Sequence, residues 1–345
     1  MIKFQLRLHA LVNNKNHIQR PIIRSLIEIV TPAPLGSLHG NRMTALRWQG
    51  FLEEFGYSVE VTESWSGDDT ALLIALHAYR SHHSIVKFKK KYPKRPIVLI
   101  LTGTDLYRDL ENHSEVIRSM EMADQLIILQ SSAVDLIPAD LRYKVQVIYQ
   151  SVEVANDIDI RDTAAKPAFL VSVIGHLREE KDPFCVVRSL PLLPSDSKIT
   201  VQHLGEAMNS QMKDLAQNFN ATVERYQWHG EVSHAEALQV LSQSRLMVIS
   251  SRMEGGAHVV SEAIALGIPV IASDIPGNRG LLGEDYPAYY PVADEKALAT
   301  LLYRAENIPA FYASLQKHID LRRELIKPAR EKQSVQEMIN ALTAK

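Results

Sequence analysis

Cysteine is almost absent: Cys185 is the one cysteine among 345 residues. A single cysteine cannot form a disulfide within the chain, and it excludes metal sites built from several cysteines of that chain. Long apolar runs are absent too, and the first 24 residues alternate apolar with basic side chains where a signal peptide would have a continuous apolar core. We therefore expect a cytoplasmic protein with no membrane partner.

The chain also lacks a strong excess of charge of either sign. Its 38 Lys and Arg residues face 40 Asp and Glu residues, which gives a formal net charge of -2. Proteins that collect nucleic-acid phosphates use a positive field, so a nucleic-acid partner is not expected. With 46% hydrophobic residues, a chain of this length can build about two domains, each with its own core.

Short runs rich in Val, Ile and Leu alternate with longer amphipathic stretches throughout the sequence. This alternation is typical of βα units that build parallel sheets. The predicted strands of the first half start at Leu26, Tyr57, Ala71, Pro96, Gln125 and Val145, and those of the second half at Phe169, Lys198, Val223, Arg245, Ile268 and Ala288.

The repeated pattern predicts an α/β protein with two Rossmann-like parallel-sheet domains that face each other across a cleft. The predicted parts are an extension of unassigned role (1–25), a first domain (26–150), a polar linker (151–168) and a second domain with terminal helices (169–345). Ligands of such sheets bind beyond the carboxyl ends of the strands. The loops that follow the strands are therefore the candidate site.

In the first half, Gly36 and Gly40 lie between the first strand and a predicted helix, with Asn41 and Arg42 directly after them. A glycine turn at a helix amino terminus leaves backbone N–H groups free for a phosphate. An ordinary turn that uses glycine for its geometry explains this loop equally well.

Two further strands of the first half end in polar residues. His77 and Arg80 follow the third strand, and Thr104 and Asp105 follow the fourth. Parallel topology predicts that these side chains converge on the cleft. For His77 the alternative is simple surface exposure, and for Asp105 it is a helix cap.

In the second half, Gly175 ends the first strand and is followed by Arg178 and Lys181. Two cations at this position can hold a diphosphate from one side of the cleft. A solvated loop whose cations pair with the neighbouring Glu179 and Glu180 is the alternative.

The stretch SRMEGGAHVVSEA, residues 251–263, follows a later strand of the second half. It places Glu254 before Gly255 and Gly256, with Glu262 eight residues after Glu254 and His258 midway. Glycines let the backbone approach a ligand, and a carboxylate can accept two hydrogen bonds from neighbouring sugar hydroxyls. A solvated helix face does not require the glycine pair, so this stretch predicts a binding site.

Two other motifs have ordinary explanations. Asp157 and Asp159 match an Asp-x-Asp metal pattern, but they fall in the predicted linker without a strand end, so we expect no metal there. The basic run from Lys87 to Arg95 reads as the solvated end of a helix, rather than a membrane-binding patch.

The two Rossmann-like halves, the Arg178 and Lys181 loop and the Glu254-to-Glu262 spacing together resemble a GT-B glycosyltransferase of the large retaining group with the E-x7-E arrangement. The resemblance covers the chain from about Leu26 to its end. It implies that Glu254 contacts hydroxyls of the donor sugar and that Glu262 binds the ribose. It also implies that Arg178 and Lys181 neutralise the departing diphosphate.

Three stretches of the first half, TPAPLGSLHGNRMTALRW, IALHAYRS and LTGTDLYRDL, resemble the selenosugar synthase family of selenoneine biosynthesis. This resemblance implies transfer from a UDP-sugar, typically UDP-N-acetylglucosamine, to selenophosphate, with formation of a carbon–selenium bond and release of UDP and phosphate. The chain departs from the family in its amino-terminal extension. It also has Thr104 and Asp105 where many members of the wider group place a histidine.

The resemblance assigns the candidate residues to three groups. The catalytic group is Glu254, Arg178 and Lys181. The donor-binding group is Gly36, Gly175, Arg178, Lys181, Glu254, Gly255, Gly256, Ala257, His258, Val259 and Glu262. The selenophosphate-binding group is Gly40, Asn41, Arg42, His77, Arg80, Thr104, Asp105 and Arg252.

Selenophosphate is already anionic, so this reaction requires a cationic pocket rather than a base, and we expect no metal or other cofactor. A conventional glycosyltransferase with a sugar or lipid hydroxyl as acceptor is the alternative. A nucleotide-sugar binding protein without activity is a third reading, which the joint presence of Arg178, Lys181, Glu254 and Glu262 disfavours.

Overall fold

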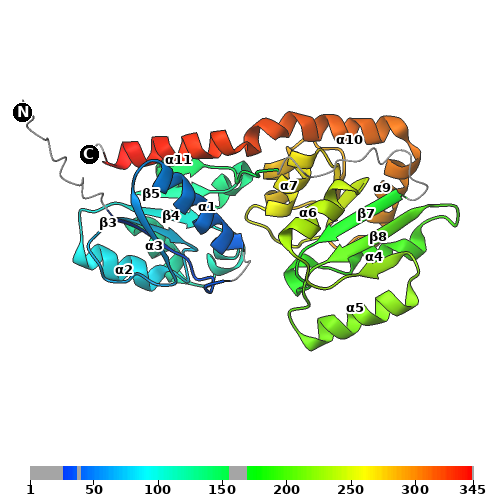
Figure 1. Cartoon of the computed structure of the whole chain (residues 1–345), viewed down its shortest axis with the longest axis horizontal. Coiled ribbons are helices and arrows are strands. Elements are labelled where there is room, and N and C mark those ends of the chain that lie inside the picture. The colour runs from blue at the N-terminus through cyan, green and yellow to red at the C-terminus, as the bar shows by residue number, and fades with distance from the viewer. Residues whose placement is uncertain (1–25, 37–39, 155–168, 344–345) are drawn as a thin grey trace, which may run out of the picture.

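A computed structural model describes residues 26–36, 40–154 and 169–343 of the chain. Two parallel sheets of six strands each lie in two separate halves (Figure 1). All twelve predicted strands are present, and central ones such as β4 (Ile97–Leu101) are uninterrupted apolar runs that the sheet buries. The predicted α/β architecture with two Rossmann-like sheets is confirmed.

The first sheet has the strand order β2-β1-β3-β4-β5-β6, and every pair is parallel. Its strands are β1 (Leu26–Val30), β2 (Ser58–Thr62), β3 (Thr70–Leu76), β4 (Ile97–Leu101), β5 (Gln125–Ile128) and β6 (Val145–Val147). β2 lies on one side of β1, and β3, the next strand along the chain, lies on the other side. Crevices at such switch points are where open α/β sheets bind ligands.

The second sheet has the order β12-β11-β10-β7-β8-β9, again with every pair parallel. Its strands are β7 (Phe169–Ile174), β8 (Ile199–Leu204), β9 (Tyr226–Trp228), β10 (Leu246–Ile249), β11 (Val270–Ser273) and β12 (Tyr289–Tyr290). The switch point lies between β7 and β10. Arg178 and Lys181 follow β7, Glu254 lies in the loop after β10, and Glu262 lies on the helix (His258–Leu266) that follows this loop.

Helices cover both sheets. In chain order they are α1 (Gly40–Glu54), α2 (His82–Lys91), α3 (Ser114–Met122), α4 (Cys185–Ser189), α5 (Ser210–Thr222), α6 (His234–Ser242), α7 (His258–Leu266), α8 (Pro276–Leu282), α9 (Glu295–Asn307), α10 (Pro309–Arg322) and α11 (Pro328–Thr343). One short segment, Asp105–Asp109, is a π-helix. Among the described residues, no helix has both the length and the apolar character needed to cross a bilayer.

The last helix, α11, packs on the first sheet although it follows the second half in sequence. Val335, Met338 and Ile339 of α11 join Trp48 of α1 in one buried cluster on a face of the first sheet. Figure 1 shows α11 running from the second half back over the first. The contact is specific, because the buried Glu331 carboxylate accepts hydrogen bonds from Trp48 Nε1 at 2.9 Å and from Arg47 Nε at 2.8 Å.

The chain therefore crosses between the halves twice, near Ser151 and again before α11. The crossings touch, because Val152 N donates to Ile326 O at 3.0 Å and Ser151 N donates to Glu331 at 2.7 Å. The predicted domain boundaries stay a prediction. Residues 1–25 and most of the predicted linker, with Asp157 and Asp159, lie outside the described residues.

The basic run on α2 forms contacts within the protein. Lys89 pairs with Asp124, Arg95 pairs with Asp69 at 2.6 Å, and Lys91 donates to Gly67 O. Arg95 also stacks over the Tyr92 ring, at 3.8 Å from its centroid. These contacts support reading the run as a solvated helix end.

Candidate active site

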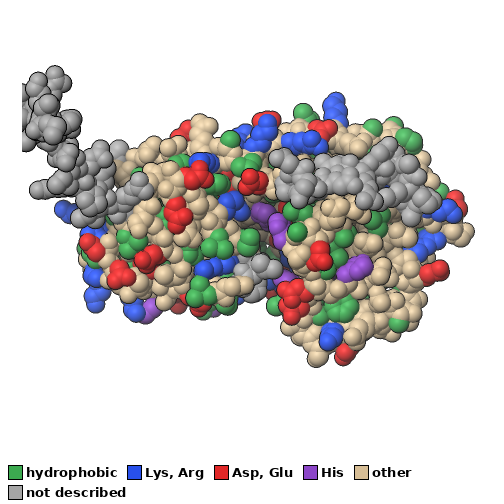
Figure 2. Space-filling view, in the orientation of Figure 1, with side chains coloured by type: hydrophobic (Ala, Val, Ile, Leu, Met, Phe, Trp, Pro, Cys, Tyr) green, Lys and Arg blue, Asp and Glu red, His purple; other side chains and the backbone are tan. Residues whose placement is uncertain are grey.

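The carboxyl ends of the two sheets enclose two adjoining cavities of about 380 and 390 Å³. We call them the His77 cavity and the Glu262 cavity, after a residue that lines one and not the other. Both are lined from the two halves, and they share Thr102 of the first half with Arg178, Lys181, Glu254 and Gly255 of the second. Figure 2 shows histidine and cationic side chains beside the hollow between the halves.

Most of the predicted site residues line one or both cavities. Those of the His77 cavity are Gly40, Asn41, His77, Arg80, Thr104, Arg178, Lys181, Glu254 and Gly255. Those of the Glu262 cavity are Gly40, Asn41, Gly175, Arg178, Lys181, Glu254, Gly255, Gly256, Ala257, His258, Val259 and Glu262. The predicted acceptor residues of the first half thus face the predicted donor residues of the second.

Four predicted residues, Gly36, Arg42, Asp105 and Arg252, lie off both cavities. The Asp105 carboxylate is fully buried and accepts backbone N–H groups instead of facing a ligand. Arg252 extends toward Asp182, whose Oδ2 lies 3.4 Å from Arg252 Nη2. Arg42 is 7% exposed, and its Nε and Nη1 have no hydrogen-bond partner among the described residues.

The glycine pair of the second half lies where the two halves touch. A Cβ added to Gly255 would lie 2.1 Å from Thr102 O and 2.6 Å from Gly103 Cα, both in the first half. A Cβ on Gly256 would lie 2.8 Å from Leu129 Cβ. The glycines are therefore required by the approach of the first half's backbone, in addition to any approach by a ligand.

Glu254 lies at the junction of the two cavities and is bonded to the residues around it. Its Oε1 forms an ion pair with Lys181 Nζ and accepts a hydrogen bond from Ser251 Oγ at 2.6 Å. The side chains predicted to hold the sugar and the diphosphate are thus paired with each other. A donor that uses both must separate this pair or bind beside it.

Glu262 is buried beneath the Glu262 cavity and is held by two histidines. Its Oε1 lies 2.7 Å from His234 Nε2 and 3.0 Å from His258 Nδ1. Burial alone would raise its pKa, but the hydrogen bonds and positive charge of the two histidines lower the pKa of Glu262 from its ordinary value of 4.5 to about 2. Glu262 is therefore a carboxylate at neutral pH, as recognition of ribose hydroxyls requires.

The amino terminus of α7 borders the same cavity. The helix begins at His258 without a side-chain cap, and Val260 N and Ser261 N donate to Ala257 O. The N–H groups of His258 and Val259 are the ones that this turn offers to an anion. The model for "Glycosyl transferases group 1" matches residues 156–332, more than half of the chain. The chain belongs to this family. The catalytic class is therefore glycosyl transfer.

Solved structures show the same fold as this group 1 glycosyl transferase. HepE of Anabaena, in complex with UDP and glucose, has a TM-score of 0.71 at 14% identity over 92% of this chain and 100% of that one. Sucrose-phosphate synthase of Thermosynechococcus elongatus has a TM-score of 0.73 at 16% identity over 93% and 100%. The predicted GT-B architecture is thereby confirmed. No curated protein matches the sequence.

Sequence reasoning missed two residues that line the cavities of this glycosyl transferase, Arg108 and His234, and a third, Asp109, that lies next to His77. Arg108 lines the His77 cavity, and Asp109 lies behind His77; both belong to the π-helix, which no sequence pattern indicates. His234 lies at the start of α6, where Ser233 and Glu236 form a capping box. That Ser-x-x-Glu signal marks a helix start after β9, and could have placed His234 at the cleft edge.

The loop that carries Arg178 and Lys181 has its own anchor, which the sequence did not reveal. Asp182 has a φ of 40°, in the left-handed region, and its carboxylate accepts from Arg188 Nη2 at 2.9 Å. Ser250 Oγ, at the end of β10, donates to the backbone oxygens of Lys181 and Asp182. Asp182 thus fixes the direction in which the loop presents its cations to both cavities.

Among the residues that the structure describes, no group of three or more His, Cys, Asp or Glu side chains is placed to hold a metal ion.

The Glu262 contacts predict a pH-dependent stability. The lowered pKa means that they stabilise the fold fully above pH 4.5 and lose this effect as the pH falls toward about 2. His234, whose pKa is raised by its hydrogen bond to Glu262, contributes fully below 6.5 and less as the pH rises through its raised value. We expect Glu262→Gln to lower the Tm more at pH 6 than at pH 3, as measured by thermal unfolding. An equal Tm loss at both pH values would contradict this assignment.

Proposed function

We propose that this protein is a selenosugar synthase, which transfers a sugar from a UDP-sugar to selenophosphate and forms a carbon–selenium bond. UDP-N-acetylglucosamine is the proposed donor, as the resemblance of the first half implies. The second half binds the donor in the Glu262 cavity, and the first half binds selenophosphate in the His77 cavity. The shared residues Arg178, Lys181 and Glu254 lie where the two substrates would meet.

The donor assignment rests on the chemistry of the Glu262 cavity. Glu262 offers an ionised carboxylate for ribose hydroxyls, and the uncapped start of α7 offers N–H groups for a diphosphate. HepE, which shares the fold, is known in structures with UDP and with UDP-glucose. These features support a uridine diphosphate sugar as the donor.

The acceptor assignment rests on one observation, the composition of the His77 cavity wall. Arg80 and Arg108 of the first half and Arg178 and Lys181 of the second all line it. Two carboxylates, Glu180 and Glu254, line it as well, and each is paired with a cation: Glu180 Oε1 lies 3.7 Å from Arg108 Nη1, and Glu254 forms an ion pair with Lys181. The four cations outnumber the two carboxylates, and this excess of positive charge suits an acceptor that arrives as an anion.

The reaction then proceeds by positioning and charge stabilisation. The selenium atom attacks C1 of the sugar, and the C1–Se bond forms as the C1–O bond to the diphosphate breaks. UDP leaves with the bonding electron pair, stabilised by Arg178, Lys181 and the α7 amides. Water then cleaves the P–Se bond, so that phosphate is released and the selenium, with a proton from the water, stays on the sugar.

The proposal is tested with purified protein, UDP-N-acetylglucosamine and selenophosphate. We expect stoichiometric release of UDP and a selenium-containing sugar, identified by mass and by the selenium isotope pattern. Arg80→Gln should raise the KM for selenophosphate, because it removes a cation from the acceptor wall and leaves the donor wall intact. The exposed Arg118 on α3, off both cavities, supplies the matched control Arg118→Gln, which should behave as wild type.

The outcome that overturns the proposal is equally direct. Turnover with a sugar or lipid alcohol and no product from selenophosphate would assign the conventional alternative. Hydrolysis of the donor without transfer to either acceptor would leave only the donor half of the proposal standing.

A further inference from the structure

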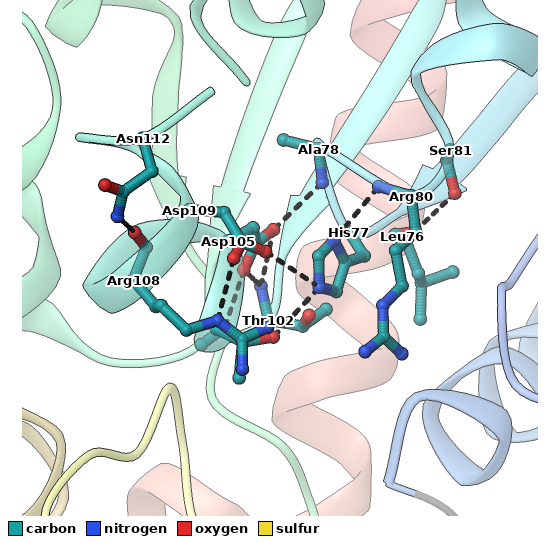
Figure 3. Close-up of polar contacts among 12 residues, drawn as sticks. Leu76, His77, Ala78, Arg80, Ser81, Thr102, Asp105, Arg108, Asp109 and Asn112 are labelled. Atoms are coloured by element: carbon teal, nitrogen blue, oxygen red, sulfur yellow. Dashed lines mark hydrogen bonds and ion pairs between the residues drawn. The ribbon is translucent and has the colours of Figure 1, made fainter. Parts of the chain in front are cut away.

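The buried His77 ring has a defined hydrogen-bond direction. His77 is 1% exposed and has a φ of 74°, which is rare for a residue other than glycine and is found where surrounding contacts enforce it. Its Nδ1 accepts the Arg80 backbone N–H at 3.3 Å (Figure 3), and its Nε2 lies 2.9 Å from Thr104 Oγ1. Because an N–H can only donate, Nδ1 is unprotonated and the hydrogen of the neutral ring is on Nε2.

The ring is neutral at physiological pH. Burial lowers the pKa of His77; the charges of Asp105 and Asp109 oppose this effect, whereas those of Arg80 and Arg108 add to it. His77 thus donates from Nε2 to the Thr104 hydroxyl oxygen. The Thr104 hydrogen is then free to donate in turn, and Thr104 lines the His77 cavity.

Two buried aspartates lie beside this arrangement. Asp109 Oδ2 is buried, lies 3.7 Å from His77 Nε2, and has no hydrogen-bond partner among the described residues. Asp105 accepts the backbone N–H groups of Ala78, Thr102 and Gly103, so it joins the loop after β3 to the loop after β4. Both aspartates belong to the π-helix, an element that is rare and often found at functional sites.

We propose that Thr104 binds the acceptor by donating a hydrogen bond from its hydroxyl to an oxygen of a tetrahedral oxyanion, and that His77 is a positioning residue that fixes the direction of this donor. Figure 3 shows the Arg80 and Arg108 side chains extending to the same side of the network, one on each flank of His77. The two arginines supply positive charge for the oxyanion, and Thr104 supplies a hydrogen bond with a fixed direction. This inference rests on the proposed function and deepens it, because it names the group that recognises the acceptor.

The first test is a comparison of Thr104→Val with Thr104→Ser. Valine keeps the shape of threonine without the hydroxyl, so we expect the KM for selenophosphate to rise about 10- to 100-fold, the effect of losing a hydrogen bond to a charged group. The KM for the UDP-sugar should stay unchanged, and serine should restore the acceptor KM. A Thr104→Val enzyme with the wild-type acceptor KM would overturn the inference.

Two variants of His77 distinguish a role in positioning Thr104 from a purely structural role. Glutamine places an amide N–H near the position of Nε2, whereas asparagine tolerates the positive φ but does not reach Thr104. A positioning role predicts a lower acceptor KM for His77→Gln than for His77→Asn, and a purely structural role predicts the reverse. The control is His82→Gln, because His82 bonds to Ser119 and lies off both cavities.

Binding of inorganic phosphate tests this inference independently of the proposed function. Titration calorimetry of the full chain should give a Kd for phosphate that Thr104→Val raises by the same factor as the acceptor KM. Equal Kd values for wild type and Thr104→Val, or no phosphate binding by the wild type, would overturn the oxyanion site. Wild type that binds phosphate through Thr104 but makes no selenium product would refute the proposed function and leave the site standing.

Discussion

Glu254→Ala is expected to lower kcat by about 10²- to 10³-fold or more, the scale of losing one preorganised electrostatic contact at a reacting centre. Glu254 lies at the junction of the two cavities, so its removal takes away the proposed contact with the donor sugar where the two substrates would meet. The affinity for UDP should change little, because UDP lacks the sugar. Steady-state kinetics and calorimetry with UDP measure the two quantities separately.

Glu262→Ala is the matched comparison, since it removes the other glutamate of the same stretch. Glu262 contacts His234 and His258 at the far end of the Glu262 cavity, so its loss should weaken UDP binding first. If both variants lost UDP affinity to the same extent, the division of roles between the two glutamates would be wrong.

Glu331→Ala is expected to lower the free energy of unfolding by about 3–5 kcal/mol, the usual cost of removing one partner of a buried ion pair. The Glu331 side chain is 1% exposed, and its carboxylate accepts from Arg47, Trp48 and the Ser151 N–H. Its loss leaves three donor residues without their acceptor, two on α1 and one in the first crossing between the halves. Urea unfolding followed by circular dichroism measures the change.

The adjacent Lys332 provides the control on the same helix. Lys332 pairs with Glu54 on the surface, and an exposed pair contributes only about 0–1 kcal/mol. Lys332→Gln should therefore leave the urea midpoint almost unchanged. A similar small shift in both variants would show that α11 is not anchored through Glu331.

The strands were predictable because parallel strands buried on both faces are continuous apolar runs. PIVLILTG, which contains β4, has five fully buried strand residues. The order of the strands in the sheet could not be predicted in this way, because the pairing of β1 with β3 depends on contacts between residues distant in sequence. The position of α11 could not be predicted either. An amphipathic pattern shows that a helix has an apolar face, but it does not show which surface that face covers.

The candidate site was predictable to the extent that strand ends determine it. Ligands of parallel sheets bind beyond the carboxyl ends of the strands, and this rule pointed to Glu254, Glu262, Arg178 and Lys181 because each follows a strand end of the second sheet. The rule indicates which loop is involved, but it does not indicate where a side chain of that loop points. Asp105 shows the difference: it follows β4 as expected, but its carboxylate turns back to three backbone amides.

The direction of side chains in the folded protein also explains why Arg108 and Asp109 were not predicted as site residues. Arg108 and Asp109 reach the cavity wall and His77 from within a π-helix, whose spacing differs from the α-helical period used to assign faces. The positive φ of His77 is likewise a property of the folded loop, since histidine has no strong preference for it.

The double passage of the chain between the two halves restricts how the cleft can open. The described parts of the two passages are hydrogen-bonded to each other through Val152 and Ile326, so they meet at one point. We therefore expect the halves to open by rotation about this point rather than by moving straight apart. Such a rotation would separate Gly255 from Thr102 and Arg108 from Glu180, so substrate entry and product release are coupled to those contacts.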